Sequence, residues 1–440
     1  MTPDADERQE KQFETWLSGK GIPFLGPEAE EKYKWRETQL KDAIQLKKPP
    51  RRVPVCPSSG FFPLEYAGIT FYDAMYDCQA LSRAWKKFQD DFAPDTYNPP
   101  TTVTSGRICD LLDFKLYRWP GHGLPNNRVF QFVEGEYMTA DEYQDLIDDP
   151  SGFSMHVYLP RIFGSLKAWE KMPLLPIIHE MHTLIRAVLP FGLPDVQTAL
   201  QTLTDAGSEA LQWLAALSDL NASIMGKGYP CFSGGITLAP FDTIGDTMRG
   251  TAGVMMDMYR RPDELLEACE RLTPLMIKRG MTGAKANEHS MIFIPLHKGA
   301  DDFMSDKHFQ TFYWPTLKKV IIGLINEGFV PQLFAEGSYN SRLEIISELP
   351  KGKTVWWFDQ TEMARAKETV GKVACLAGNV PLSLLCTGTP DDVKAYCKNL
   401  IDVAGKDGGF ILSSGAGMQG SKPANVKALI DFSKEYGIYT

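Results

Sequence analysis

The chain has 440 residues, of which 43% are hydrophobic and 23% charged, so it has enough apolar material to build the sizeable core of a soluble globular protein. Its net charge of -9, without a cluster of Lys and Arg, argues against a nucleic-acid partner. The charged N-terminus lacks the apolar core of a signal peptide, and no window approaches the ~20 apolar residues of a membrane span, so we expect a cytoplasmic protein without a membrane partner.

The first 45 residues predict a helical extension that precedes the main domain. They are rich in Glu, Lys and Gln, and their apolar residues recur at helical spacing. Paired prolines at 49 and 50 then end the helical pattern, and Val53 to Cys56 has the composition of a short strand. We therefore divide the chain into a helical extension, residues 1–45, and one large domain, residues 46–440.

The second half of that domain alternates between strands and helices, whereas residues 60–160 show helical patches without clear bounds. Proline near the first turn predicts a helix from 262, and Ser305 caps another that runs to Asn326 and is interrupted by Pro315. A third helix follows the cap Thr389. The predicted strands span 291–297, 330–335, 354–359, 373–379 and 409–414.

These strands are apolar throughout, as in a parallel sheet that is covered by helices on its outer faces. The chain has neither the GxGxxG motif of dinucleotide-binding folds nor the GxxxxGK[ST] motif of phosphate-binding loops. We therefore predict an α/β fold, a (β/α)8 TIM barrel with an N-terminal helical extension.

Polar residues terminate each of the late strands, and in a parallel barrel the chemistry lies at the carboxyl ends of strands. Glu336 is the strongest candidate, because a carboxylate directly after so apolar a strand suffers desolvation unless it is paired, coordinated or used. The set of strand-end residues comprises His297, Lys298, Glu336, Asp359, Gln360, Asn379, Ser413 and Ser414.

Structural roles compete with functional ones at several of these positions. His297 could be a core histidine, although the glycine and two acids of PLHKGADDFMS favour function. Asp359 and Asn379 could cap the following helices, and Ser413 with its neighbour could form a turn or bind an anion through backbone amides. In the strand TVWWFD, alternation places one indole outward and the other, Trp357, in the lumen, where it could form the floor of a pocket.

HEMH, residues 179–182, places two imidazoles three residues apart on a helix, and metal binding competes there with simple packing. No third ligand is evident nearby, and the spacing is not the HExxH of zinc proteases.

Three segments together resemble the uroporphyrinogen decarboxylase superfamily. They are RVPVCPSSGFFPLEYAGIT near the start, GVMMDMYRRPDELLEA in the middle, and GNVPLSLLCTGTPDDV with GGFILSSGAG near the end. The resemblance covers residues 45 to 440 and implies a single (β/α)8 barrel with its active site at the carboxyl-terminal mouth. It also implies one of two chemistries, cofactor-free decarboxylation of porphyrinogen acetates or methyl transfer that involves a corrinoid protein.

Departures from the family pattern favour methyl transfer. The decarboxylases carry an Arg-rich loop after the first strand, whereas CPSSGFFPLEYAG contains no arginine. Methyltransferases that activate coenzyme M use a His-x-Cys zinc motif and a later cysteine, and Phe334, Glu336 and Ala416 stand in those places here. The resemblance therefore points to the substrate methyltransferases (O-demethylases), which move a methyl group onto cobalamin carried by a partner.

The function expected is thus methyl transfer from a small methylated compound, such as a methoxylated aromatic, to cob(I)alamin on a separate corrinoid protein. Glu336 and His297 are the expected catalytic residues; with Asp359 they could hold a zinc ion, or a buried Glu336 could act as general acid. Trp357, Tyr339, Asn379 and Ser413 are the expected substrate contacts. A decarboxylase and a non-catalytic corrinoid- or tetrapyrrole-binding barrel are the alternatives, and a homodimer is left open.

Overall fold

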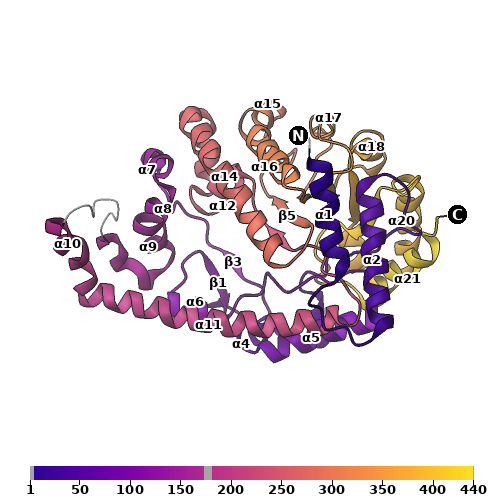
Figure 1. Ribbon diagram of the computed structural model, residues 1–440, viewed down its shortest axis with the longest axis horizontal. Coiled ribbons are helices and arrows are strands. Elements are labelled where there is room, and N and C mark those ends of the chain that lie inside the picture. Colours follow the sequence, from indigo (N-terminus) through magenta and orange to yellow (C-terminus); the bar gives the residue numbers. More distant parts are fainter. Residues whose placement is uncertain (1–3, 173–180, 440) are drawn as a thin grey trace.

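The computed structural model describes residues 4–172 and 181–439, in which helices surround a parallel sheet (Figure 1). The sheet has six strands in the order β4-β5-β6-β7-β8-β9, and every neighbouring pair is parallel. These strands are β4 (Gly235–Ile236), β5 (Met291–Leu296), β6 (Val330–Ala335), β7 (Val355–Phe358), β8 (Cys375–Val380) and β9 (Phe410–Ser414).

Two extended segments close this sheet into a barrel. Val55 pairs in parallel with Leu412 of β9, and Tyr97 pairs in parallel with Cys231 just before β4. The amide of Asp95 donates to the carbonyl of Val55, which joins the two segments to each other. Six strands and two segments make the eight-membered (β/α)8 barrel that the sequence predicts, with Val53–Cys56 as its first member. Prolines in both segments lack an amide donor, so only isolated pairing forms there.

Helices occupy most of the remaining chain. The α-helices are α1 (Ala5–Ser18), α2 (Pro27–Gln45), α3 (Phe62–Ala67), α4 (Phe71–Tyr76), α5 (Cys78–Phe92), α6 (Gly106–Leu112), α7 (Tyr143–Asp148), α8 (Pro150–Phe153), α9 (Leu159–Ile162), α10 (Met181–Val188), α11 (Pro194–Met225), α12 (Pro240–Thr247), α13 (Gly250–Arg260), α14 (Pro262–Ala286), α15 (Asp306–His308), α16 (Trp314–Asn326), α17 (Leu343–Ile346), α18 (Met363–Glu368), α19 (Leu382–Thr387), α20 (Pro390–Val403) and α21 (Pro423–Tyr436). None of the helices in the described part of the chain is long and apolar enough to cross a bilayer.

Local sequence accounts for several helix ends. Thr389 caps α20 and forms a capping box with Asp392, while Pro390 opens the helix. Ser305 caps α15 as expected, accepting a bond from the amide of His308. The helix predicted from there to Asn326 is divided, because Pro315 cannot donate a backbone bond and a π-helical turn, Phe309–Tyr313, separates α15 from α16.

A long, mostly helical segment stands between the second and third members of the barrel. It contains a small sheet in the order β2-β1-β3, formed by β1 (Tyr117–Pro120), β2 (Gly123–Leu124) and β3 (Gln131–Phe132). Its longest element, α11, passes beside the barrel, and the end that adjoins α10 projects away from it (Figure 1).

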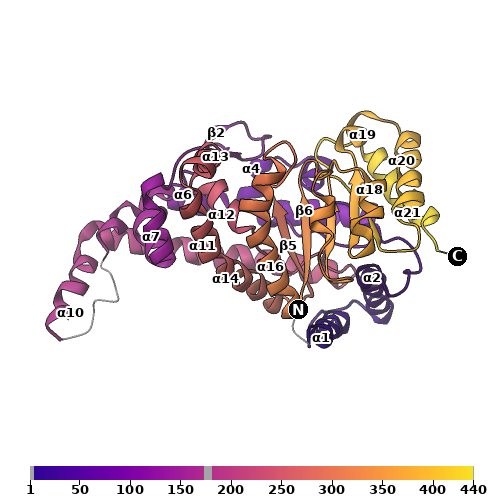
Figure 2. The ribbon, with the colours of Figure 1, turned by 90° about the horizontal axis from the view of Figure 1, so that it is seen from above.

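The N-terminal helices α1 and α2 cover the amino ends of the barrel strands. Side chains of both helices, such as Phe13, Trp16 and Ile44, form one buried cluster with residues that begin the strands, including Met291 and Val330. Figure 2 shows these helices on one side of the strands and α19, which follows β8, on the other. The carboxyl ends of the strands, where α19 begins, are therefore left as the open mouth.

Candidate active site

Strand register places the predicted polar residues in one layer at the carboxyl-terminal mouth. Phe334, Trp357, Ala377 and Ile411 are partners across β6 to β9, and all belong to the cluster inside the barrel. Because side chains alternate along a strand, the residues two positions further on face inward in the next layer. They are Glu336, Asp359, Asn379 and Ser413.

His297 meets Glu336 at this mouth. His297 follows β5 directly, and its Nε2 lies 3.8 Å from Oε1 of Glu336. Both side chains are partly exposed, 34% and 43%, so a ligand can reach the space between them. The convergence of these two residues from separate strands is what the sequence predicted.

Two aspartates of α12 complete the cluster, and sequence reasoning missed both. Asp246 accepts a 2.6 Å bond at Oδ2 from Nδ1 of His297 and a 2.8 Å bond at Oδ1 from Nζ of Lys298. Asp242 is fully buried and accepts bonds from the amides of His297 and Lys298 at 3.0 and 3.1 Å, and from the hydroxyl of Tyr313 at 2.7 Å. Asp242 therefore fixes the turn after β5, and Asp246 holds the two side chains of that turn.

The cluster keeps His297 protonated. Burial by itself would lower the pKa of His297, but the hydrogen bond to Asp246 and the charges of Asp246, Asp242 and Glu336 outweigh burial and raise it to about 9. The hydrogen bond to His297, with the charges of His297 and Lys298, in turn lowers the pKa of Asp246 against the effect of its own burial. At neutral pH an imidazolium is therefore paired with a carboxylate, with Nε2–H directed toward Glu336.

The two remaining carboxyl groups of the cluster are harder to ionise. Burial, with a smaller contribution from the charge of Asp246, raises the pKa of Asp242 to about 7. Burial also raises the pKa of Glu336, and the charges of Asp246 and Asp359 add to this while His297 opposes it. Glu336 can thus accept or release a proton more readily near neutral pH than an exposed glutamate.

Asp359 approaches this cluster but does not complete a metal site. Its Oδ2 accepts bonds from the amide of Gly337 at 3.2 Å and from the amide side chain of Gln360 at 3.3 Å. Within the described residues, no group of three or more His, Cys, Asp or Glu side chains is arranged to hold a metal ion. The predicted zinc set of His297, Glu336 and Asp359 therefore does not fit this arrangement.

The predicted substrate contacts divide into two groups. Asn379 donates from Nδ2 to the carbonyl of Thr361, and its Oδ1 has no donor among the described residues. The neighbouring hydroxyl of Ser413 is likewise buried without a partner in the described part of the chain. A bound water or ligand would satisfy both groups.

The two aromatic contacts lie deeper than predicted. Trp357 is in the barrel interior as alternation predicts, 4% exposed, with its ring 4.6 Å from that of Phe334 and its Nε1 donating to the carbonyl of Ser414. Tyr339 is fully buried, with its ring 6.5 Å from that of Phe309. The chain turns inward after Gly337 and Tyr339 belongs to the core cluster, so its contact with substrate stays a prediction.

The HEMH segment lies partly outside the described residues. Residues 173–180 are not described, so the pairing of His179 with His182 that the sequence suggested is outside the structure.

Known proteins resemble this chain at the level of family and fold. Residues 195–436 match the model of the uroporphyrinogen decarboxylase (URO-D) family, a span that includes the cluster from Asp242 to Ser413. The chain belongs to the URO-D family. A methyltransferase from Methanosarcina mazei has a similar fold, with a TM-score of 0.57 and 17% sequence identity over 91% of this chain and 98% of that one. A comparison with curated proteins finds no match.

Proposed function

We propose that this URO-D family member is a methyltransferase that takes a methyl group from a small methoxylated compound and passes it to a corrinoid protein, with His297 as general acid. The observation that carries the proposal is the line of groups from Asp246 through His297 to Glu336. It holds a protonated imidazole at the barrel mouth with its second N–H free to meet a ligand.

Cleavage of a methyl ether needs a proton at the departing oxygen, because an unprotonated alkoxide or phenolate is a poorer leaving group. Nε2 of His297 and Oε1 of Glu336 are 3.8 Å apart, so an oxygen that lies beside the pair on its open side can be within hydrogen-bond reach, about 2.8 Å, of both. His297 gives its Nε2 proton to that oxygen, Asp246 stabilises the imidazolium before transfer, and Glu336 returns a proton from solvent.

The corrinoid would be carried by the partner and would supply the nucleophile that accepts the methyl group. The residues of this chain need only hold the donor, orient its methyl group toward the mouth and protonate the oxygen. The partial exposure of His297 and Glu336 fits an outside partner, because a cofactor can approach the donor only from the open side of the mouth.

An aromatic side chain in the loop after the first barrel segment supports an aromatic donor. Phe61, in the loop after the first barrel segment, lies 6.1 Å from Phe130, whose ring is also 5.3 Å from that of Tyr117. Burial raises the pKa of Tyr117, and the charge of Asp246 adds to this. The loop that is rich in arginine in the decarboxylases thus contributes an aromatic ring here.

The decarboxylase alternative loses support because the cations it would use are already paired. Lys298 is bonded to Asp246, Arg249 forms a buried ion pair with Asp257, and the fully buried Arg342 pairs with Asp306. A substrate with many carboxylates would have to displace these partners or approach an acid-rich mouth, and both are costly.

The proposal is tested by mixing the protein with a reduced corrinoid protein and a panel of methoxylated aromatic compounds while the visible spectrum is recorded. We expect conversion of cob(I)alamin to methylcobalamin with at least one donor, and release of the matching phenol. Release of carbon dioxide from porphyrinogens would support the decarboxylase instead. Tight corrinoid binding without either reaction would support the non-catalytic alternative.

A further inference from the structure

A cavity lies where the N-terminal helices meet the barrel, and its lining differs from the residues at the mouth. Its volume is about 810 Å³, and its walls come from the loop between α1 and α2, the end of α11, β4 and the last turns of α14. None of His297, Glu336 and Asp246 contributes to its lining. The volume is in the range of small-molecule sites, so the cavity could hold a ligand independently of the mouth.

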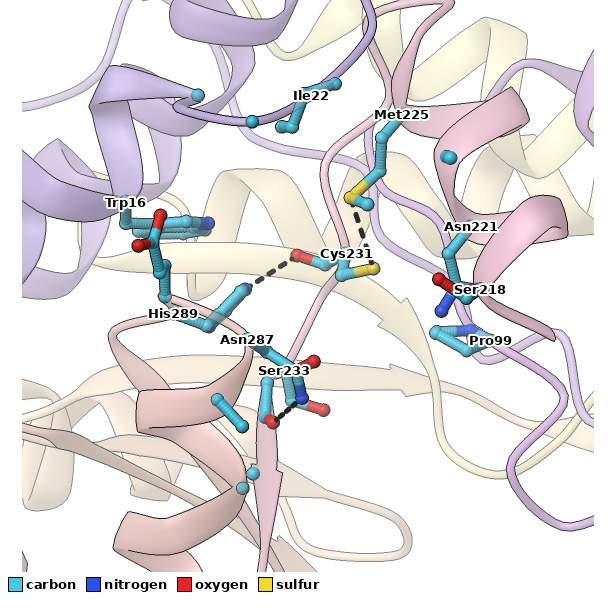
Figure 3. A pocket seen from close by; sticks show the side chains of 18 of the residues that line it. Trp16, Ile22, Pro99, Ser218, Asn221, Met225, Cys231, Ser233, Asn287 and His289 are labelled. Carbon is cyan, nitrogen blue, oxygen red and sulfur yellow. Dashed lines mark hydrogen bonds between the residues drawn. The ribbon is translucent and has the colours of Figure 1, made fainter. Parts of the chain in front are cut away.

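Trp16 offers this cavity a hydrogen-bond donor that the protein leaves unused. Its side chain is 2% exposed, and its Nε1 has no acceptor among the described residues. One face of its ring is occupied by His289, at a centroid distance of 4.6 Å. Figure 3 shows the indole nitrogen pointing into the cavity. A buried donor without an acceptor destabilises the fold, and a bound acceptor would remove this cost.

Arg279 offers a second and charged donor. It lies on α14 and lines the cavity, and within the described residues it forms no hydrogen bond or ion pair. Burial, without an opposing carboxylate, lowers the pKa of its guanidinium. By surface area the Arg279 side chain is exposed, so it stands at the open side of the cavity, unlike the buried Arg249 and Arg342, which each have an acidic partner. Because no acidic partner among the described residues holds it, the Arg279 guanidinium is available to an anion that enters the cavity.

Asn221 adds a third donor opposite Trp16 (Figure 3). Its Oδ1 accepts a 2.9 Å bond from the hydroxyl of Tyr97, which orients the side-chain amide. The Nδ2 group has no acceptor among the described residues and can donate to a ligand. Three unused donors from three elements therefore line one cavity.

The overall charge of the lining is positive. Lys20 and Arg279 are its cations and Glu288 is its carboxylate, which leaves a balance of one positive charge. His289 adds none, because burial lowers its pKa to about 4.

Apolar side chains form the rest of the walls. Ile236 of β4 is 47% exposed although it belongs to the barrel sheet, and it lines the cavity together with Ile22, Met225 and Phe293. The small residues Gly235, Gly280 and Gly283 let α14 lie directly on β4, since a Cβ at Gly235 would be 2.5 Å from the carbonyl of Gly280. This close packing brings Arg279 beside the apolar wall.

We propose that this cavity is a binding site for a small organic anion with an apolar body. The anionic group meets Arg279, with Trp16 Nε1 and Asn221 Nδ2 as further donors, and the body packs against Ile22, Met225, Ile236 and Phe293. The extension made by α1 and α2 then has a role beyond covering the barrel, because it supplies Trp16 and one wall of the site. The site is separate from the proposed methyl transfer and does not depend on it.

The test compares two fluorescent probes, 1-anilinonaphthalene-8-sulfonate and its uncharged analogue N-phenyl-1-naphthylamine, on the intact protein. Because the sulfonate meets the guanidinium, we expect saturable anion binding that weakens about tenfold in Arg279→Gln, as for the loss of one charged hydrogen bond. Binding of the neutral probe should not change. Trp16→Phe, which keeps the ring and removes the N–H, should weaken anion binding by a smaller factor.

Matched controls separate this site from other surfaces. Lys278→Gln removes the same charge one residue away, outside the lining, and should bind both probes as the wild type does. Ile185→Ser removes an exposed apolar side chain of α10, 73% exposed, that could attract the dye, and Glu336→Gln alters the mouth. Both should leave the saturable anion site intact. Equal anion affinity in Arg279→Gln and Lys278→Gln, or no saturable binding in the wild type, would overturn the proposal.

Discussion

Two histidines stand at opposite ends of the same strand, and their surroundings give them opposite chemistry. His289 precedes β5 at the amino end, where burial lowers its pKa to about 4 and its partners are the carbonyl of Cys231 and the amide of Met291. His297 follows β5 at the mouth, where Asp246 raises the pKa to about 9. A neutral ring that completes backbone hydrogen bonds is structural, and a charged ring in an open mouth is suited to catalysis.

The largest expected effect is at the mouth histidine. His297→Gln keeps a polar side chain of similar reach but cannot supply the proton, so we expect methyl transfer to fall by about 10²–10⁴-fold, the usual contribution of a general acid. The measurement is single-turnover demethylation with an ether donor. A donor with a better leaving group should be affected less, and equal losses for good and poor leaving groups would contradict the role as acid.

Glu336→Gln should have the next largest effect. The amide is nearly isosteric and leaves the fold intact, but it cannot pass a proton to His297, so we expect a loss of about 10²-fold in methyl transfer. Thermal unfolding provides the control, because the midpoint should match that of the wild type. Wild-type rates in this variant would refute the role of Glu336.

Asp246→Asn changes how pH affects the same reaction. The raised pKa of His297 means that activity should persist through neutral pH and decline as pH rises through about 9. Without the carboxylate the pKa falls toward its ordinary value, so the decline should move to lower pH and activity should recover on acidification. A pH–rate profile that is unchanged in Asp246→Asn would show that this pair does not control the proton.

The smallest effect on activity is expected at the amino end. His289→Ala should leave methyl transfer unchanged and destabilise the fold by about 1–3 kcal/mol, because the amide of Met291 and the carbonyl of Cys231 lose their partner. The lowered pKa of His289 means that the unfolded state binds a proton first. Stability should therefore fall as pH drops from about 6.5 toward 4 in the wild type.

Chemical denaturation across this pH range provides the measurement for His289. A weaker dependence on pH is expected in His289→Ala, since the titrating group is gone. An unchanged dependence would show that other groups dominate acid stability.

The late strands could be read from sequence because each is a continuous apolar run, such as Val330–Ala335, bounded by turn residues. The first member, Val53–Cys56, was also predicted, but the second and third were not, because they are short and flanked by prolines and glycines, and β4 has only two residues. This failure also concealed Asp242 and Asp246. Without a recognised strand before Pro240, nothing marked PFDTIGD as a helix at the mouth, although its aspartates stand four residues apart on one face.

The candidate site shows the same division. Strand-end position correctly brought His297 and Glu336 together, since register and alternation follow from sequence. The burial of a loop residue does not follow from the sequence in this way. Tyr339, only three residues beyond Glu336, is part of the core. Protonation of His297 was also beyond sequence reasoning, because it depends on Asp246 from a distant segment.

The most direct test of the account is an NMR titration of the imidazole of His297, assigned among the seven histidines by comparison with His297→Gln. The account predicts that His297 stays protonated at neutral pH and titrates near 9, and that Asp246→Asn returns the pKa toward its usual range near 6.5. A wild-type His297 that titrates at or below 6.5, or a pKa that does not respond to Asp246→Asn, would contradict it.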